Sequence, residues 1–227
     1  MTFFRSLVVA LSLGALLPVL AWAQGSVKLP KPKLTGKVSV ETAILRKKSV
    51  RNFSGGSITL EQASQLLWAC NGDLPTDAVS SATTKVIPSA GGLYPLEVYL
   101  VTGPETVTGL AAGVYQYVPA SNSLTLVEAG DRRPQLAAAC LSQMWMARAP
   151  VMVIIGGVFA RTTAKYGNQG MQYVLIEAGS SMQNLYLEAE ALGLGAGAVG
   201  AFQGQQVCGV AKIPQTVTPL LVVAVGK

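Results

Sequence analysis

The longest helical pattern in the chain covers residues 169–192 and ends before Gly193. Its residues are apolar around most of the helical circumference, whereas a helix at a protein surface carries its apolar residues along one stripe. Such a helix must be covered on several sides by other elements or by a second chain. The pattern therefore predicts a long central helix, either inside the core or at the seam of a dimer.

Shorter helices and strands are predicted on both sides of this helix. The expected helices cover residues 40–48, 59–71 with a Thr59–Gln62 capping box, 131–146 with Asp131 as the cap, and 203–211. The expected strands cover 96–102, a hairpin of 113–118 and 123–127, a doubly buried run within 149–158, a strand after a glycine-dense turn within 195–202, and 220–225. Because the two types neither alternate strictly nor segregate, we expect an α+β fold with helices around a mostly antiparallel sheet.

The N-terminus has the pattern of a secretory signal peptide over residues 1–23. Arg5 precedes an apolar run over 7–20, and Ala21-Trp22-Ala23 forms a small-residue cleavage site. An uncleaved membrane anchor is the alternative, but the short run and the cleavage site favour removal. We therefore expect an exported, periplasmic protein without a membrane span. It would comprise an extended leader over 24–39 and a single domain over 40–227.

Composition excludes several kinds of site. The chain has no histidine, which removes His-based zinc sites and Ser-His-Asp triads, and its three cysteines fit no metal motif. Each cysteine is expected in the core, although one disulfide with one thiol left over remains open. The net charge of +6 could suggest nucleic-acid binding, but the basic residues are not interleaved with the aromatic residues typical of that function. Only 12% of the residues are charged, so a homodimer that covers apolar surface is expected.

Two separated motifs have the chemistry that a nucleotide-like cofactor requires. In residues 47–53, Lys47, Ser49 and Arg51 alternate, so an extended backbone would direct all three side chains to one side, toward a phosphate. In residues 88–95, small residues would let main-chain N–H groups approach a planar ring closely.

With four further segments, these motifs resemble the nitroreductase family, and most closely its SagB-type, thiazoline-dehydrogenase-like branch. The further segments are 113–117, 165–168, 177–185 and 191–196, all in the family's order. The resemblance implies a nitroreductase-like fold with FMN at a homodimer interface. It also implies ping-pong hydride transfer through flavin N5 on a small organic substrate. That substrate would be a nitro- or quinone-type electrophile or an azoline-like donor, with NAD(P)H as a candidate electron donor.

The resemblance also assigns site residues by matching position. The expected phosphate ligands are Lys47, Ser49, Arg51 and the late basic residue Lys227. The residues expected along the flavin ring are Ser89, Ala90, Gly91 and Gly92 on one side, and Gly195, Ala196, Val199 and Gly200 near the other edge. Tyr94, Tyr166 and Lys165 are candidate substrate contacts. No catalytic side chain is assigned, because flavin N5 carries the chemistry, and no metal is expected.

The chain departs from the family pattern in ways that leave alternatives open. Lys47 and Lys48 replace two arginines, and Ser180 replaces a histidine common in the branch. Serine is a poor proton-transfer group at neutral pH. One alternative is therefore a non-catalytic flavin-binding or electron-carrier protein. Another is an exported structural protein whose glycines serve close packing. The polar helix residues Glu177 and Gln183 could face a flavin, a subunit seam or a helix-anchoring partner.

Overall fold

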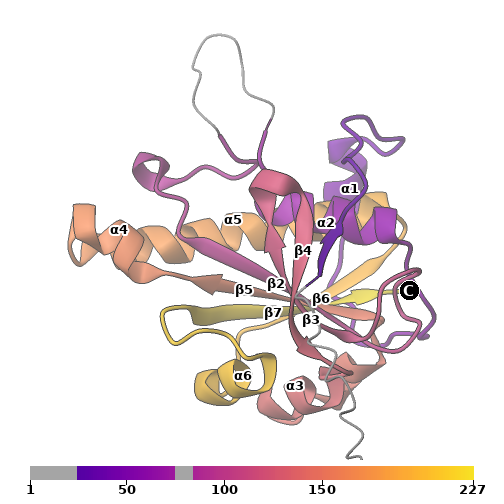
Figure 1. The fold of residues 1–227 in the computed structure, drawn as a ribbon. Helices are drawn as coiled ribbons and strands as arrows, with labels where there is room; N and C mark the ends of the chain where they lie inside the picture. Colours follow the sequence, from indigo (N-terminus) through magenta and orange to yellow (C-terminus); the bar gives the residue numbers. More distant parts are fainter. Residues whose placement is uncertain (1–24, 75–83) are drawn as a thin grey trace, which may run out of the picture.

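The structure is a computed structural model that describes residues 25–74 and 84–227, and its framework is a seven-stranded sheet (Figure 1). The strands are β1 (Ser26–Lys28), β2 (Leu96–Thr102), β3 (Gly113–Val118), β4 (Ser123–Ala129), β5 (Val151–Gly157), β6 (Gly195–Val199) and β7 (Thr218–Gly226). Their order is β1-β4-β3-β2-β5-β7-β6, and every neighbouring pair is antiparallel. The predicted α+β fold with an antiparallel sheet is confirmed.

Helices cover both faces of the sheet. They are α1 (Val40–Arg46), α2 (Leu60–Asn71), α3 (Arg133–Ala139), α4 (Phe159–Tyr166), α5 (Gln169–Ala191) and α6 (Gly204–Ala211), with short 3₁₀ turns η1 (Ala90–Gly92), η2 (Pro119–Ser121) and η3 (Met144–Arg148). Figure 1 shows α2 and α5 on one side of the sheet and α3 and α6 on the other. Each layer encloses its own core, because alternate side chains of the strands point to opposite faces. Val153 packs on the α2 and α5 side, and Ile154 packs on the α3 and α6 side.

Several local predictions are confirmed. The capping box that starts α2 is complete, since the Gln62 N–H donates to Thr59 Oγ1 at 3.1 Å and the Thr59 N–H donates to Gln62 Oε1 at 3.0 Å. Strand β2 has the predicted bounds, and β5 is buried along its whole length. The β3–β4 hairpin turns through residues 119–122, where Asn122 adopts the left-handed conformation with φ 43°.

The predicted helix over 131–146 is wrong. Helix α3 ends at Ala139, because Leu141 and Ser142 have φ values of 53° and 58°, which no right-handed helix contains. The chain then continues as η3. Asp131 lies one residue before the N-cap position, which Arg132 occupies, although Asp131 Oδ1 still accepts the Arg133 N–H at 3.0 Å.

Other boundaries also differ from the predictions. Helix α1 ends at Arg46, and the leader contains β1, which pairs with β4. The glycine-dense segment after α5 is itself the edge strand β6, and α4 was not predicted. These elements are stabilised by packing against distant parts of the chain. Local sequence patterns contain no information about such contacts.

Two segments fall wholly or partly outside the described residues. The signal peptide predicted over 1–23 lies outside them, as does most of the polar segment over 73–85. At the ends of the second segment, Asp73 and Lys85 form a β-bridge and an ion pair of 2.9 Å. Within residues 25–74 and 84–227, no helix combines the length and apolar character needed to cross a bilayer.

Candidate functional site

The predicted phosphate-binding segment lies against the edge strand β6. The Val50 N–H donates to the Ala196 carbonyl at 2.8 Å, and Ser49 bridges Ala196 in parallel orientation. Gly197 allows this approach, because a Cβ at that position would lie 2.2 Å from the Val50 carbonyl oxygen. The structure therefore brings Ser49 together with Gly195 and Ala196, two segments far apart in the sequence.

Tyr186 of α5 joins these two segments. Its hydroxyl accepts the Ala198 N–H at 2.7 Å and lies 3.4 Å from Ser49 Oγ. The Lys47 ammonium lies 5.9 Å from the centre of the Tyr186 ring, at the distance of a cation–π contact. Lys47, Tyr186 and Gly195 help to line a pocket of about 270 Å³. The sequence analysis did not identify Tyr186, because its role depends on contacts far apart in sequence.

The remaining predicted cations lie at the same edge of the fold. Both the N–H and the hydroxyl of Ser54 donate to the Lys227 carbonyl, at 2.8 and 3.1 Å, so Lys227 contacts a residue three positions after Arg51. Arg51 and Lys227 are exposed, and within the described part of the chain neither they nor Lys47 form an ion pair. We name Lys47, Ser49, Arg51 and Lys227 the basic cluster.

The loop predicted to lie along a flavin ring is attached to α5 by Glu177. Glu177 Oε1 accepts the Ser89 hydroxyl and the Ala90 N–H, both at 2.9 Å, and Ser89 Oγ accepts the Tyr94 N–H at 2.8 Å. Gly91 and Gly92 follow with φ values of 62° and 67°, a conformation that favours glycine. We name residues 89–92 the glycine loop.

Glu177 is the least solvated carboxyl group near the loop. Only 3% of its surface is exposed, and its Oε2 is buried without a partner among the described residues. Burial raises the pKa of Glu177, while the hydrogen bonds from Ala90 and Ser89 oppose that rise. Glu177 therefore anchors the glycine loop to α5.

The candidate substrate residues lie next to the glycine loop. A Cβ on Gly91 would lie 2.6 Å from the Tyr166 hydroxyl and 2.9 Å from Lys165 Nζ. The Tyr166 ring meets the Tyr173 ring edge-on, with centroids 5.2 Å apart. Tyr94 has a φ of 44°, and the Lys85 ammonium lies 5.7 Å from its ring centre. Cationic and aromatic groups thus surround the loop.

The basic cluster and the glycine loop lie on opposite faces of α5. Tyr186, which contacts the cluster, follows Glu177, which binds the loop, by nine positions, or two and a half helical turns. The two residues therefore point in opposite directions from the helix axis and lie about 13.5 Å apart along it. Within one chain the helix therefore lies between the basic cluster and the glycine loop.

The structure also places Val199, Gly200 and Ser180, three further residues that the sequence analysis singled out. Val199 is buried in the core on the α3 and α6 side, and Gly200 lies directly beyond the end of β6. The Ser180 hydroxyl donates to the Ile176 carbonyl at 3.1 Å, one turn earlier in α5. Among the described residues, no three His, Cys, Asp or Glu side chains gather as a metal site would require.

Comparison with known proteins gives consistent results. A nitroreductase of Methanocaldococcus jannaschii is 36% identical over 191 residues, which cover 84% of this chain and 92% of that protein. The microcin B17-processing protein McbC of Escherichia coli is 30% identical over 139 residues, covering 60% of this chain and 51% of McbC.

A solved nitroreductase structure from Ralstonia eutropha superimposes with a TM-score of 0.73 at 23% identity, covering 89% of each chain, and so supports the fold. The model of the nitroreductase family matches residues 44–227, which include the basic cluster, the glycine loop and α5. The chain therefore belongs to the nitroreductase family.

Proposed function

We propose that this protein is an exported, FMN-dependent oxidoreductase that acts on small organic substrates as a homodimer. The observation that carries the proposal is the presence of two complementary half-sites. The basic cluster has the charge to bind a phosphate, and the glycine loop has the open backbone to lie against a planar ring. Family membership as an oxidoreductase supports the same conclusion.

The residues present fit an FMN phosphate at the basic cluster. The guanidinium of Arg51, the ammonium groups of Lys47 and Lys227 and the hydroxyl of Ser49 are all donors, and a dianionic phosphate accepts hydrogen bonds from such groups. The cations form no ion pairs among the described residues, so their charge is available to a ligand. In this proposal they anchor the phosphate and thereby position the rest of the cofactor.

The glycine loop fits the ring. Gly92 has no atom within 4 Å of the position its Cβ would take, which leaves space above the loop. Glu177 holds the loop in place and offers one buried, unpartnered oxygen. When bound, FMN would supply hydride chemistry at N5. The protein would bind and orient it, and Lys165 and Tyr166 would present a cation and a hydroxyl to a substrate beside Gly91.

The separation of the half-sites by α5 supports a homodimer. In this proposal the basic cluster of one chain and the glycine loop of its partner contact the same flavin, and α5 lies at the seam. The apolar residues Leu175 and Ile176 of α5 are 54% and 64% exposed, as expected for a surface that a second chain covers.

The substrate classes remain those that the resemblance implies. They are nitro- or quinone-type electrophiles, or an azoline-like donor, with NAD(P)H as the candidate electron donor. Similarity to McbC supports the thiazoline-dehydrogenase-like branch. Export is supported by the signal-peptide pattern in residues 1–23.

The test is to incubate the purified protein with FMN, remove free ligand by desalting and record the visible absorption spectrum. A retained flavin spectrum that bleaches with a reductant and recovers on addition of a quinone is the expected result. A retained spectrum without reoxidation by any acceptor would instead favour the non-catalytic flavin-binding alternative. Loss of all flavin at micromolar protein would contradict both functions.

Arg51→Ala tests the phosphate assignment directly. Loss of one charge-assisted contact should weaken FMN binding by about 1.5–3 kcal/mol, or roughly 10- to 150-fold in Kd. The dissociation constant is measured by quenching of flavin fluorescence. Lys31→Ala, which removes one exposed positive charge from the leader, is the matched control and should leave the Kd unchanged. Equal effects of the two substitutions would show that only net charge matters.

A further inference from the structure

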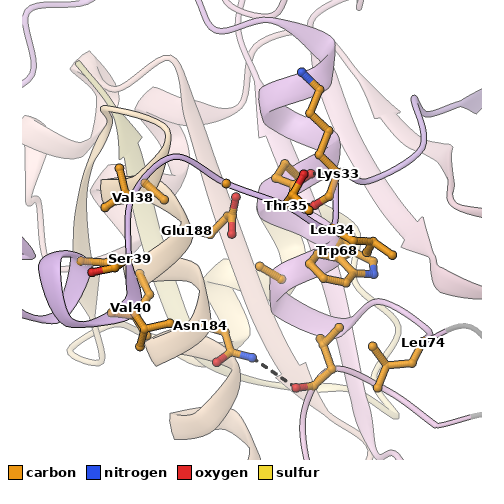
Figure 2. Close-up of a pocket in the computed structure, with 17 residues that line it drawn as sticks. Lys33, Leu34, Thr35, Val38, Ser39, Val40, Trp68, Leu74, Asn184 and Glu188 are labelled. Atoms are coloured by element: carbon orange, nitrogen blue, oxygen red, sulfur yellow. Dashed lines mark hydrogen bonds between the residues drawn. The ribbon is translucent and has the colours of Figure 1, made fainter.

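A pocket of about 450 Å³ lies between the leader, α2 and α5, away from the residues assigned to the flavin and its substrate (Figure 2). Residues 33–36, 38 and 39 of the leader and Val40 of α1 form part of its wall, and they precede the region matched by the family model, which begins at residue 44. The pocket therefore includes a part of this chain that the family region does not contain.

The leader is fixed at both ends of the pocket. The Lys33 N–H donates to Gln65 Oε1 at 2.9 Å, and Gln65 Nε2 donates to the Lys33 carbonyl at 3.0 Å. At the other end, Ser39 Oγ accepts the Thr42 N–H at 3.2 Å and caps α1. Because these contacts exist in the protein itself, the pocket is formed before any ligand arrives, as is usual for small-molecule sites.

Most of the pocket wall is apolar. Trp68 of α2 contributes its indole ring, and its single polar atom, Nε1, already donates to the Asp73 carbonyl at 3.2 Å. Leu187 and Ala191 of α5 and Val86 add aliphatic surface. A ligand would therefore bury an apolar or aromatic body against these residues, gaining the free energy of removing that surface from water.

The pocket also contains hydrogen-bond acceptors that form no ion pair among the described residues. Asn184 and Glu188 lie one turn apart on α5 and share a face of the helix. Figure 2 shows both side chains extending toward the space between α5 and α2, and shows the Lys33 side chain directed away from it. The Asn184 amide N–H donates to the Val86 carbonyl at 3.4 Å, so its Oδ1 can accept from a ligand.

Glu188 is the acidic residue that lines the pocket. Within residues 25–74 and 84–227 it forms no ion pair. Burial raises the pKa of Glu188, and a hydrogen bond from Gln65 opposes the rise. A half-buried carboxylate that pairs with no cation in the described part of the chain is unusual in a sequence with 17 Lys and Arg residues against 11 Asp and Glu residues.

We propose that this pocket binds a small organic ammonium ion with an apolar or aromatic body. The ammonium would donate to the Glu188 carboxylate and to Asn184 Oδ1, and the body would pack against Trp68, Leu187 and Ala191. An ammonium group has three donors and no acceptor, which matches a set of acceptors. The Glu188 carboxylate would repel an anion such as FMN, so the ligand preference of this site differs from that of the basic cluster.

The test is calorimetric titration of the purified protein, with and without FMN, using 2-phenylethylammonium as the probe and neutral 2-phenylethanol as its comparison. We expect saturable binding of the ammonium, at least about tenfold tighter than that of the alcohol. Glu188→Gln should weaken ammonium binding at least about tenfold. Glu105→Gln, an exposed site with the same charge change, should have no effect.

Ala191→Phe supplies an independent arm, since it keeps the carboxylate but fills the pocket, and it should also abolish binding. It replaces Glu188→Gln if that variant does not fold. Equal affinity of the ammonium for wild-type and Glu188→Gln protein, equal affinity of the ammonium and the alcohol, or no saturable binding at millimolar probe would each overturn the proposal. None of these results depends on whether FMN binds.

Discussion

Glu177 connects α5 to the glycine loop through a single carboxylate oxygen. Glu177→Ala would leave the Ser89 hydroxyl and the Ala90 N–H without their acceptor. The free energy of unfolding should fall by about 1–3 kcal/mol, the cost of unsatisfied buried donors. Urea unfolding measures the change. Glu177→Gln, which retains an acceptor oxygen, is the control and should remain close to wild type. If the two variants unfold at the same urea concentration, the contact with the loop does not stabilise the fold.

The same residue predicts a pH dependence. Since burial raises the pKa of Glu177 in the folded state, the folded protein binds the proton more tightly than the unfolded chain does. The stabilisation is therefore complete below the ordinary pKa of glutamate and is lost as pH rises through the raised pKa. The difference in unfolding free energy between wild type and Glu177→Gln should decrease over that window. A difference that is constant with pH would contradict the direction of the shift.

At the scale of elements, the contact between strand β6 and residues 49–50 depends on Gly197. Gly197→Ala places a methyl group 2.2 Å from the Val50 carbonyl oxygen and 2.9 Å from the Trp145 ring. The segment should move away from β6 and lose the hydrogen bond between Val50 and Ala196. We expect a loss of about 1–3 kcal/mol in unfolding free energy, measured by urea denaturation, and lower FMN retention.

Gly209→Ala is the matched control for Gly197→Ala. Gly209 lies within α6, and no atom lies within 4 Å of the position its Cβ would take. Alanine favours a helix interior over glycine, so this variant should be more stable by about 0.5–1 kcal/mol. Equal destabilisation by both substitutions would mean that the close approach of Val50 to β6 is not what requires glycine at position 197.

The bounds of the helices and strands show which features local sequence patterns can predict. The bounds of β2, the start of α2 and the β3–β4 hairpin follow from side-chain alternation, a capping box and turn residues, which act over a few positions. Helix α3 ended earlier than predicted, since nothing in its local pattern excludes a helix at Leu141 and Ser142. The strand character of the glycine-rich β6 comes from its pairing with β7, which a local reading does not include.

For the whole molecule, the half-site arrangement predicts an obligate dimer. Leu175→Glu introduces a charge at the exposed apolar face of α5, so it should yield a monomer by multi-angle light scattering and reduce FMN retention. Met144→Glu changes a similarly exposed residue in η3, on the opposite side of the sheet, and should leave the dimer intact. A wild-type monomer that retains FMN would rule out the shared site.

The sequence by itself determined the family and the antiparallel α+β framework, and it indicated the residues proposed for both half-sites, because motifs and local periodicity lie within short stretches of the chain. Only the tertiary structure decided how those residues are grouped. Glu177 and Tyr186 lie nine positions apart on one helix, and the two and a half turns between them direct one toward the glycine loop and the other toward the basic cluster. That the loop and the cluster lie beside these two residues depends on contacts between positions far apart in the chain, which no single segment specifies.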